Sequence, residues 1–106
     1  IYGVAEFLDF IDSQISVAST HWSLARMSRV DRNILRISTY EMGFLPEIPM
    51  RVSINEAIEI AKEYGTDDSP MFVNGVLDNL AHTFEANPET LKRALDTQRK
   101  RLAANG

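Results

Sequence analysis

Apolar side chains recur every three or four residues along most of this chain, a spacing that places them on one face of an α-helix. The clearest case is the stretch 49–84, which divides into two such patterns. The first apolar face consists of Ile54, Ala57, Ile58 and Ala61. The second consists of Phe72, Val73, Val76, Leu77 and Leu80. We therefore predict two helices paired as an αα-hairpin.

The residues at the ends of these two helices predict where each begins and stops. Ser53, three residues before Glu56, fits a capping box at the start of the first helix. Gly65 stands where a residue in the left-handed conformation would end that helix. Ser69 followed by Pro70 suits the N-cap and first turn of the second helix.

Three further helices are expected outside the hairpin. Residues 1–19 carry apolar positions spaced for one amphipathic helix. A second helix spans 29–42, with Ser28 and Asp31 as its capping pair and Gly43 as its stop. Val30, Ile34, Leu35 and Ile37 supply its buried side. The last runs over 88–103, where Asn87 is the expected N-cap and proline and glutamate fill the first turn.

Two connecting segments complete the prediction. Residues 20–27 hold one or two turns, in which Trp22 is expected to pack as a core or domain-edge residue. Residues 45–49 are a connector, because their two prolines exclude regular helix. The predicted fold class is all-α, a compact helical bundle of about five helices.

Composition limits the protein to one domain without disulfide or thiolate chemistry. The chain has 106 residues, enough for a single modest core, and no cysteine. No apolar run approaches the length of a membrane span, and no signal-peptide pattern is present. We expect a cytoplasmic protein without membrane contact.

Catalytic patterns are missing from the sequence. It has no cysteine nucleophile, no Gly-rich phosphate loop and no paired histidines for a metal. His21 and His82 fall in different predicted segments, and Glu56 and Glu59 suit a solvated helix face. We expect no enzyme, no metal site and no cofactor.

Several polar residues interrupt the apolar faces. Asn55 and Asn74 lie beside apolar positions, and a buried amide without a partner costs about 1–3 kcal/mol. Each is expected to tie down a neighbouring helix end or loop, with ligand contact as the alternative. Gly75, in mid-helix, is expected to permit close helix–helix approach.

Arg36 is a further polar residue within an apolar pattern, flanked by Leu35 and Ile37. Its guanidinium is expected to lie across the edge of the core. Glu56 or Asp78 would be its acidic partner.

The same stretch resembles a known family. The strings NEA at 55–57, AK at 61–62, DS at 68–69 and FVNGVLD at 72–78 resemble the NusB family of bacterial transcription antitermination factors. The resemblance extends upstream through VDRNILRI at 30–37, YE at 40–41 and IP at 48–49. It implies a NusB-like helical domain over residues 1–86, followed by a C-terminal helical extension over 87–106.

The resemblance implies a function in ribosomal RNA transcription. Such proteins bind a boxA-like RNA together with a NusE-type small-subunit ribosomal protein, and the pair joins the RNA polymerase antitermination complex. Carried over by position, the RNA- or partner-binding candidates are Asp31, Asp68 and Phe72. If its ring is partly exposed, Phe72 could stack on an unpaired base, which contributes about 1–3 kcal/mol.

The chain departs from the family pattern at three places. It has no match to the family's arginine-rich first helix, and we expect it to be a fragment of a longer protein. It also carries Met71 and Met50 where relatives often have lysine and tyrosine. We therefore expect residues 1–106 alone to have little affinity for boxA-like RNA. Uncovered apolar surface also predicts that the chain self-associates as a homodimer.

Two other functions stay open. A NusB-like domain also serves as an RNA-binding accessory domain in some ribosomal RNA methyltransferases, whose string is nearer VNAVLR. Gly75 and Asp78 favour the antitermination factor. The other alternative is a purely protein-binding helical module.

The basic C-terminus allows two interpretations of its own, a solvated helix end or a patch that faces phosphates. Its cations are Lys92, Arg93, Arg99, Lys100 and Arg101.

Overall fold

The computed structural model describes residues 7–20 and 22–105, and every regular element in these ranges is helical. The elements are α2 (Leu8–Ala18), the short 3-10 helix η1 (Leu24–Arg26), α3 (Arg29–Phe44), α4 (Met50–Tyr64), α5 (Ser69–Ala86) and α6 (Pro88–Asn105). The predicted all-α fold class is confirmed. The first six residues of the predicted helix 1–19 lie outside the described ranges.

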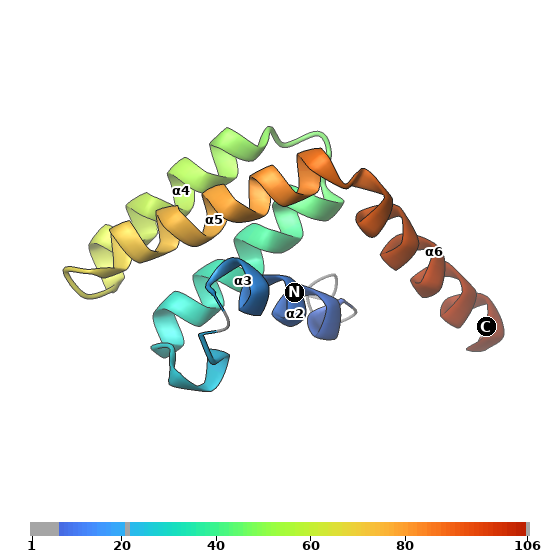
Figure 1. The fold of residues 1–106 in the computed structure, drawn as a ribbon, viewed down its shortest axis with the longest axis horizontal. Helices are drawn as coiled ribbons and strands as arrows, with labels where there is room; N and C mark the ends of the chain where they lie inside the picture. The colour runs from blue at the N-terminus through green and yellow to red at the C-terminus, as the bar shows by residue number, and fades with distance from the viewer. Residues whose placement is uncertain (1–6, 21, 106) are drawn as a thin grey trace.

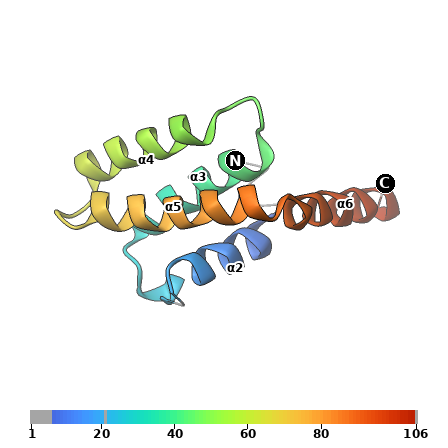
Figure 2. The same cartoon turned by 45° about the horizontal axis from the view of Figure 1, so that its top comes forward.

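Helix α5 is the centre of the bundle. It forms an antiparallel hairpin with α4, and α3 crosses beneath the pair (Figure 1). Helix α2 packs on α5 and α3, so that α2 and α4 flank α5 (Figure 2). The predicted αα-hairpin is therefore confirmed, and it supplies one layer of a two-layer bundle.

The predicted apolar faces of the hairpin form the core. Ile54, Val73 and Leu77 are almost completely removed from solvent. Each such aliphatic side chain contributes about 1.5–3 kcal/mol through burial. From the other layer the core receives Ile11, Ile15, Ile34, Leu35 and Met42. Ile58 and Phe72, at the edges of the predicted faces, are only partly buried.

Two predictions for helix α3 were wrong. Ile37 was expected on the buried side but is 39% exposed, because it lies beyond the edge of the face that Ile34 and Leu35 define. Gly43 does not end the helix, which continues to Phe44. A Cβ at Gly43 would lie 2.9 Å from Cδ2 of Leu91, so this glycine makes room for α6.

The predicted capping residues at the hairpin were mostly wrong. Pro49 is the N-cap of α4, and Ser53 lies inside the helix, buried. Gly65 ends α4 with φ of −91°, outside the left-handed region. Ser69 is the first residue of α5 rather than its N-cap, which is Asp68.

Ser69 instead closes the turn between the two helices. Its buried Oγ accepts a hydrogen bond from the backbone N–H of Thr66 at 2.9 Å. A Cβ at Gly65 would collide with this hydroxyl. Glycine is thus required at position 65 by close approach and not by backbone conformation.

The other helix ends agree with the predictions made from the sequence. The Oγ of Ser28 accepts a hydrogen bond from the N–H of Asp31 at 3.1 Å, which confirms the predicted cap of α3. Pro88 begins α6, and Glu89 lies in its first turn as expected.

Helix α6 leaves the bundle (Figure 1). Leu91 packs against the core, whereas the side chain of Leu102 lies outside the described residues. The division into a domain over 1–86 and an extension over 87–106 stays a prediction. None of the helices in the described ranges is long and apolar enough to cross a membrane.

Candidate RNA- and partner-binding surface

The three residues predicted as a binding site line one surface groove. Asp31 comes from the first turn of α3, while Asp68 and Phe72 come from the start of α5. The groove has a volume of about 370 Å³, and its other lining residues are Trp22, Arg26, Met27 and Ser28. We call it the Trp22–Phe72 groove.

Local backbone structure fixes the positions of these side chains. Ser28 caps α3 and so holds Asp31 in the first turn. At the start of α5, the N–H of Phe72 donates to the carbonyl oxygen of Asp68 at 3.1 Å, which places the ring one turn after the carboxylate. Pro70 restricts the backbone between them. Both acidic residues therefore stand at helix N-termini, where the helix dipole favours negative charge.

The carboxylates give the groove an acidic character that Arg26 offsets only in part. Oδ1 of Asp31 is buried and accepts no hydrogen bond from the described residues. An unpaired buried acceptor costs about 1–3 kcal/mol.

Two aromatic side chains form the apolar part of the groove. Phe72 is partly exposed, which meets the condition for base stacking. Trp22 is 52% exposed, so it does not lie in the core, and the other predicted place, at the domain edge, stays a prediction. It lies in the connector between α2 and η1, outside every apolar face, and that position was the sequence signal for an exposed ring.

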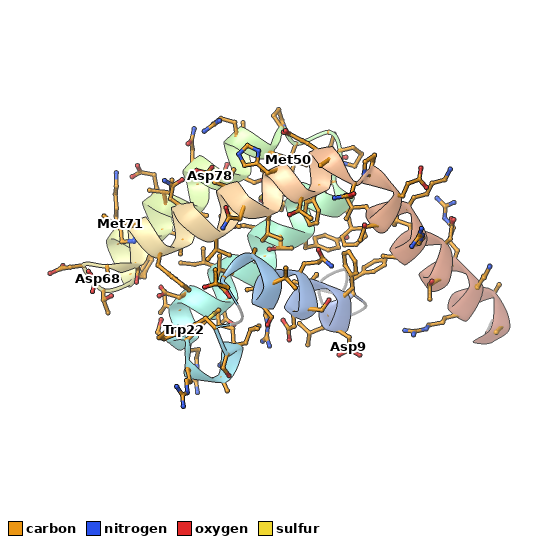
Figure 3. The ribbon with its side chains drawn as sticks, viewed as in Figure 1. Asp9, Trp22, Met50, Asp68, Met71 and Asp78 are labelled. Atoms are coloured by element: carbon orange, nitrogen blue, oxygen red, sulfur yellow. The ribbon has the colours of Figure 1, made fainter. Side chains whose placement is uncertain are left out.

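Phe72 also lines a second groove. It has a volume of about 440 Å³ and runs along α5 beside the C-terminal end of α2. Its lining residues are Ala18, Ser19, Thr20, Met71, Phe72, Gly75, Val76, Asp78 and Asn79. We call it the Gly75 groove. Figure 3 shows Asp68 and Met71 at one end of α5 and Asp78 further along it.

Gly75 has no packing role in the bundle, which contradicts the predicted close helix–helix approach. A Cβ placed on it would meet no atom of residues 7–20 and 22–105 within 4 Å. The residue instead faces the second groove. Across the groove, Nδ2 of Asn79 donates to the carbonyl oxygen of Ala18 at 3.0 Å and ties α5 to the end of α2.

The predicted tie of the two asparagines to a neighbouring helix end or loop is wrong, and the alternative, ligand contact, stays a prediction. Asn55 and Asn74 are exposed, and no hydrogen bond of either side chain occurs among the described residues. Each follows a buried residue directly, and one residue of α-helix turns its side chain about 100° from that neighbour. Glu56 is exposed as well.

Arg36 spans the edge of the core as predicted, but with a different partner. It binds Asp12 of α2 through Nε–Oδ1 and Nη2–Oδ2, both at 2.9 Å. The suggested partners, Glu56 and Asp78, lie elsewhere. The sequence could not select Asp12, which is 24 positions away and becomes a neighbour only when α2 packs on α3.

A third hollow lies between the start of α4 and α5. Met50, Arg51, Asp78, His82 and Glu85 are among its lining residues. The described residues contain no group of three histidine, cysteine, aspartate or glutamate side chains that could hold a metal ion. His21 lies outside the described ranges.

These features define a class of protein, an all-α helical bundle with a candidate surface around the start of one hairpin helix. Comparison with known proteins narrows that class. The model of the NusB family matches residues 1–82. The chain belongs to the NusB family.

Individual relatives agree with this assignment. The chain is 54% identical over 83 residues to a transcription antitermination protein NusB from Citrifermentans bemidjiense, covering 78% of this chain and 57% of the relative. It is 51% identical over 98 residues to the protein of the same name from Trichlorobacter lovleyi, covering 92% and 66%. The structure of T. maritima NusB matches with a TM-score of 0.73 and 54% identity, over 76% of this chain and 57% of that one. The chain thus spans little more than half the length of several relatives.

Proposed function

We propose that this chain acts as an RNA-binding transcription antitermination factor. Its partners would be a NusE-type small-subunit ribosomal protein and boxA-like RNA, within the RNA polymerase antitermination complex on ribosomal RNA operons. The observation that carries the proposal is that Asp31, Asp68 and Phe72, named through the family resemblance, line one groove.

The groove offers two kinds of contact. The exposed faces of Trp22 and Phe72 suit stacking on unpaired bases, which contributes about 1–3 kcal/mol per base. The carboxylates of Asp31 and Asp68 repel phosphate and attract basic side chains. We assign the rings to RNA and the carboxylates to the protein partner.

The charge of the chain supports binding of RNA as a pair with that partner. The chain contains eleven lysines and arginines against fifteen aspartates and glutamates, a net charge of −4, and only six of the cations fall within residues 1–87. RNA affinity depends on cations that neutralise phosphates. The chain alone should therefore bind boxA-like RNA weakly, and the ribosomal protein would supply the missing positive charge. A role in transcription would place the protein in the bacterial cytoplasm.

The two alternatives receive less support. The relatives compared above carry the name of antitermination proteins. An accessory domain of a ribosomal RNA methyltransferase would instead be expected to match such enzymes. A purely protein-binding module could use the same rings as interface anchors, and it would show no discrimination between boxA-like and scrambled RNA.

A titration of labelled boxA-like RNA tests the proposal. The RNA is added to the chain alone, to the NusE-type protein alone, to their mixture and to the full-length protein with that partner. We expect the mixture to bind more tightly than either component and to discriminate against a scrambled RNA. Equal binding of both RNAs, or no gain on mixing, would contradict the proposal.

A further inference from the structure

Helix α6 packs on the bundle only near its start. Figures 1 and 2 show it extending away from the α4–α5 hairpin, and its 18 residues span about 27 Å. Leu91 packs against the core close to Gly43, whereas Leu95, one turn further on, is only partly buried. Every side chain that is described from residue 96 onward is exposed. Because helices in proteins are stabilised mainly by packing of an amphipathic face, a partner for α6 is expected outside the bundle.

The charge of α6 is opposite to that of the rest of the chain. The helix contains five of the eleven lysines and arginines but only two of the fifteen carboxylates. Helical spacing places Lys92 and Arg99 on one side of the face that carries Leu91 and Leu95, and Arg101 on the other. None of these cations forms an ion pair among the described residues. Cations that flank an apolar face in this way select an acidic partner helix.

The outer face of α4 has the complementary character. Glu56, Glu59 and Glu63 follow one another at spacings of three and four residues, so they share one side of the helix, and all three are exposed. Beside them the large apolar residues Val52 and Ile60 are 43% and 46% exposed. This face is turned away from the residues that α4 buries in the core. A basic amphipathic helix would match both its charge and its apolar part.

We propose that α6 of one copy of this chain binds the outer face of α4 of a second copy. Leu95 packs on Val52 and Ile60, and Arg99 and Arg101 pair with the glutamates of α4. Within one copy α6 extends away from the hairpin, so the contact is made between copies (Figure 1). In a symmetric dimer the contact is made twice, because each copy contributes both surfaces. The inference goes beyond the proposed function and gives the cations of α6 a role other than RNA binding.

An exchange of charges between the two helices tests the contact. The first variant, Arg99→Glu with Arg101→Glu, makes the flanks of α6 acidic. The second, Glu56→Lys with Glu63→Lys, makes the outer face of α4 basic. Association is measured by sedimentation over a range of protein and salt concentrations, for each variant alone and for their equimolar mixture. The melting temperature of each variant shows that it is folded.

The proposal predicts a loss of association in each variant and its recovery in the mixture. The wild-type chain should dimerise, and its dimer should weaken as the salt concentration rises. The dimer dissociation constant of each variant alone should increase about ten- to a hundredfold, because like charges then face each other. In the mixture each acidic helix face again meets a basic one.

A matched control separates this contact from an effect of net charge. Asp9→Lys with Glu85→Lys changes the net charge as much as the α4 variant does, at exposed positions of α2 and α5. This control should dimerise as the wild type does. An equal loss of association in the control and in the α4 variant would contradict the proposed location.

Four other results would overturn the proposal. They are a wild-type chain that stays monomeric, charge variants that associate as the wild type does, and folded variants whose mixture stays monomeric. The fourth is a full-length protein that stays monomeric where residues 1–106 dimerise, because another part of that protein would then cover one of the two faces. Weaker binding of boxA-like RNA by the α6 variant, with unchanged self-association, would identify RNA as the occupant of the basic helix.

Discussion

Arg36 and Asp12 join α3 to α2 through a bidentate ion pair with both N–O distances at 2.9 Å. Their side chains are 26% and 28% exposed, so the pair is shielded from most of the solvent. Bidentate geometry and partial burial make it stronger than a surface ion pair. It holds α2 in place, and the end of α2 forms one wall of the Gly75 groove.

Breaking this pair should destabilise the bundle. We expect Asp12→Asn or Arg36→Lys to lower the free energy of unfolding by about 1–2 kcal/mol. Chemical denaturation measures the loss, and the double variant gives the coupling energy. Lys62 and Glu59 form an exposed pair at 3.3 Å and provide the control. Lys62→Ala should cost less than about 0.5 kcal/mol. Equal losses from the two pairs would contradict this account.

Gly65 is the glycine that packing requires most strongly. An alanine there would collide with the buried hydroxyl of Ser69 and lie 2.8 Å from the carbonyl oxygen of Ala61. We expect Gly65→Ala to destabilise the protein by about 1–3 kcal/mol in thermal unfolding. Gly43→Ala should cost less, because its closest contact is the end of the flexible Leu91 side chain. A larger loss of stability in Gly43→Ala than in Gly65→Ala would contradict the view that close packing against Ser69 requires glycine in the hairpin turn.

The two groove carboxylates should matter for the protein partner. Asp31→Asn and Asp68→Asn remove charge while keeping size, and neither residue forms an ion pair among the described residues. We expect each to weaken binding of the NusE-type protein by about 1–2 kcal/mol and to make the affinity less sensitive to salt. Glu63→Gln, an exposed change outside both grooves, is the control. Unchanged affinity in both groove variants would remove the carboxylates from the interface.

The basic end of α6 should be dispensable for RNA binding. Arg99, Lys100 and Arg101 are exposed and suit a solvated helix. We expect their joint replacement by glutamine to leave the salt dependence of RNA binding by the two-protein complex unchanged. If these cations contact phosphates, the slope of the logarithm of the binding constant against the logarithm of the salt concentration should decrease in magnitude by about 0.7 for each cation removed.

Periodicity predicted much of the fold, because burial of an apolar face depends mainly on residues three and four positions apart. Ile54, Val73 and Leu77 are in the core for that reason. Capping residues were predicted less well, because a neighbouring residue can start the helix instead and a serine hydroxyl can bond to another part of the backbone. At Pro49 the fixed proline backbone starts α4 before Ser53 can cap it. At position 69 the serine hydroxyl closes the turn instead of capping the helix.

The residues of the candidate site could not be predicted from the periodicity of apolar positions. Asp31 and Phe72 were named through family resemblance, and only the packing of α3 beside α5 brings them to one groove. Trp22 was assigned to the core or the domain edge by its size, although it lies outside every apolar face. Gly75 was predicted to permit close helix packing, but in the folded bundle it is exposed and no described residue packs against it.

We propose above all that the start of α5 binds RNA and its protein partner through the Trp22–Phe72 groove. Binding of labelled boxA-like RNA to the two-protein complex, compared between the wild type and Phe72→Leu, tests it most directly. Leucine keeps the apolar packing and removes the ring, and Tyr64→Leu removes an exposed ring outside both grooves as the control. We predict that Phe72→Leu weakens RNA binding by about 1–3 kcal/mol, while Tyr64→Leu has no effect. Wild-type RNA affinity in a folded Phe72→Leu protein would contradict the claim.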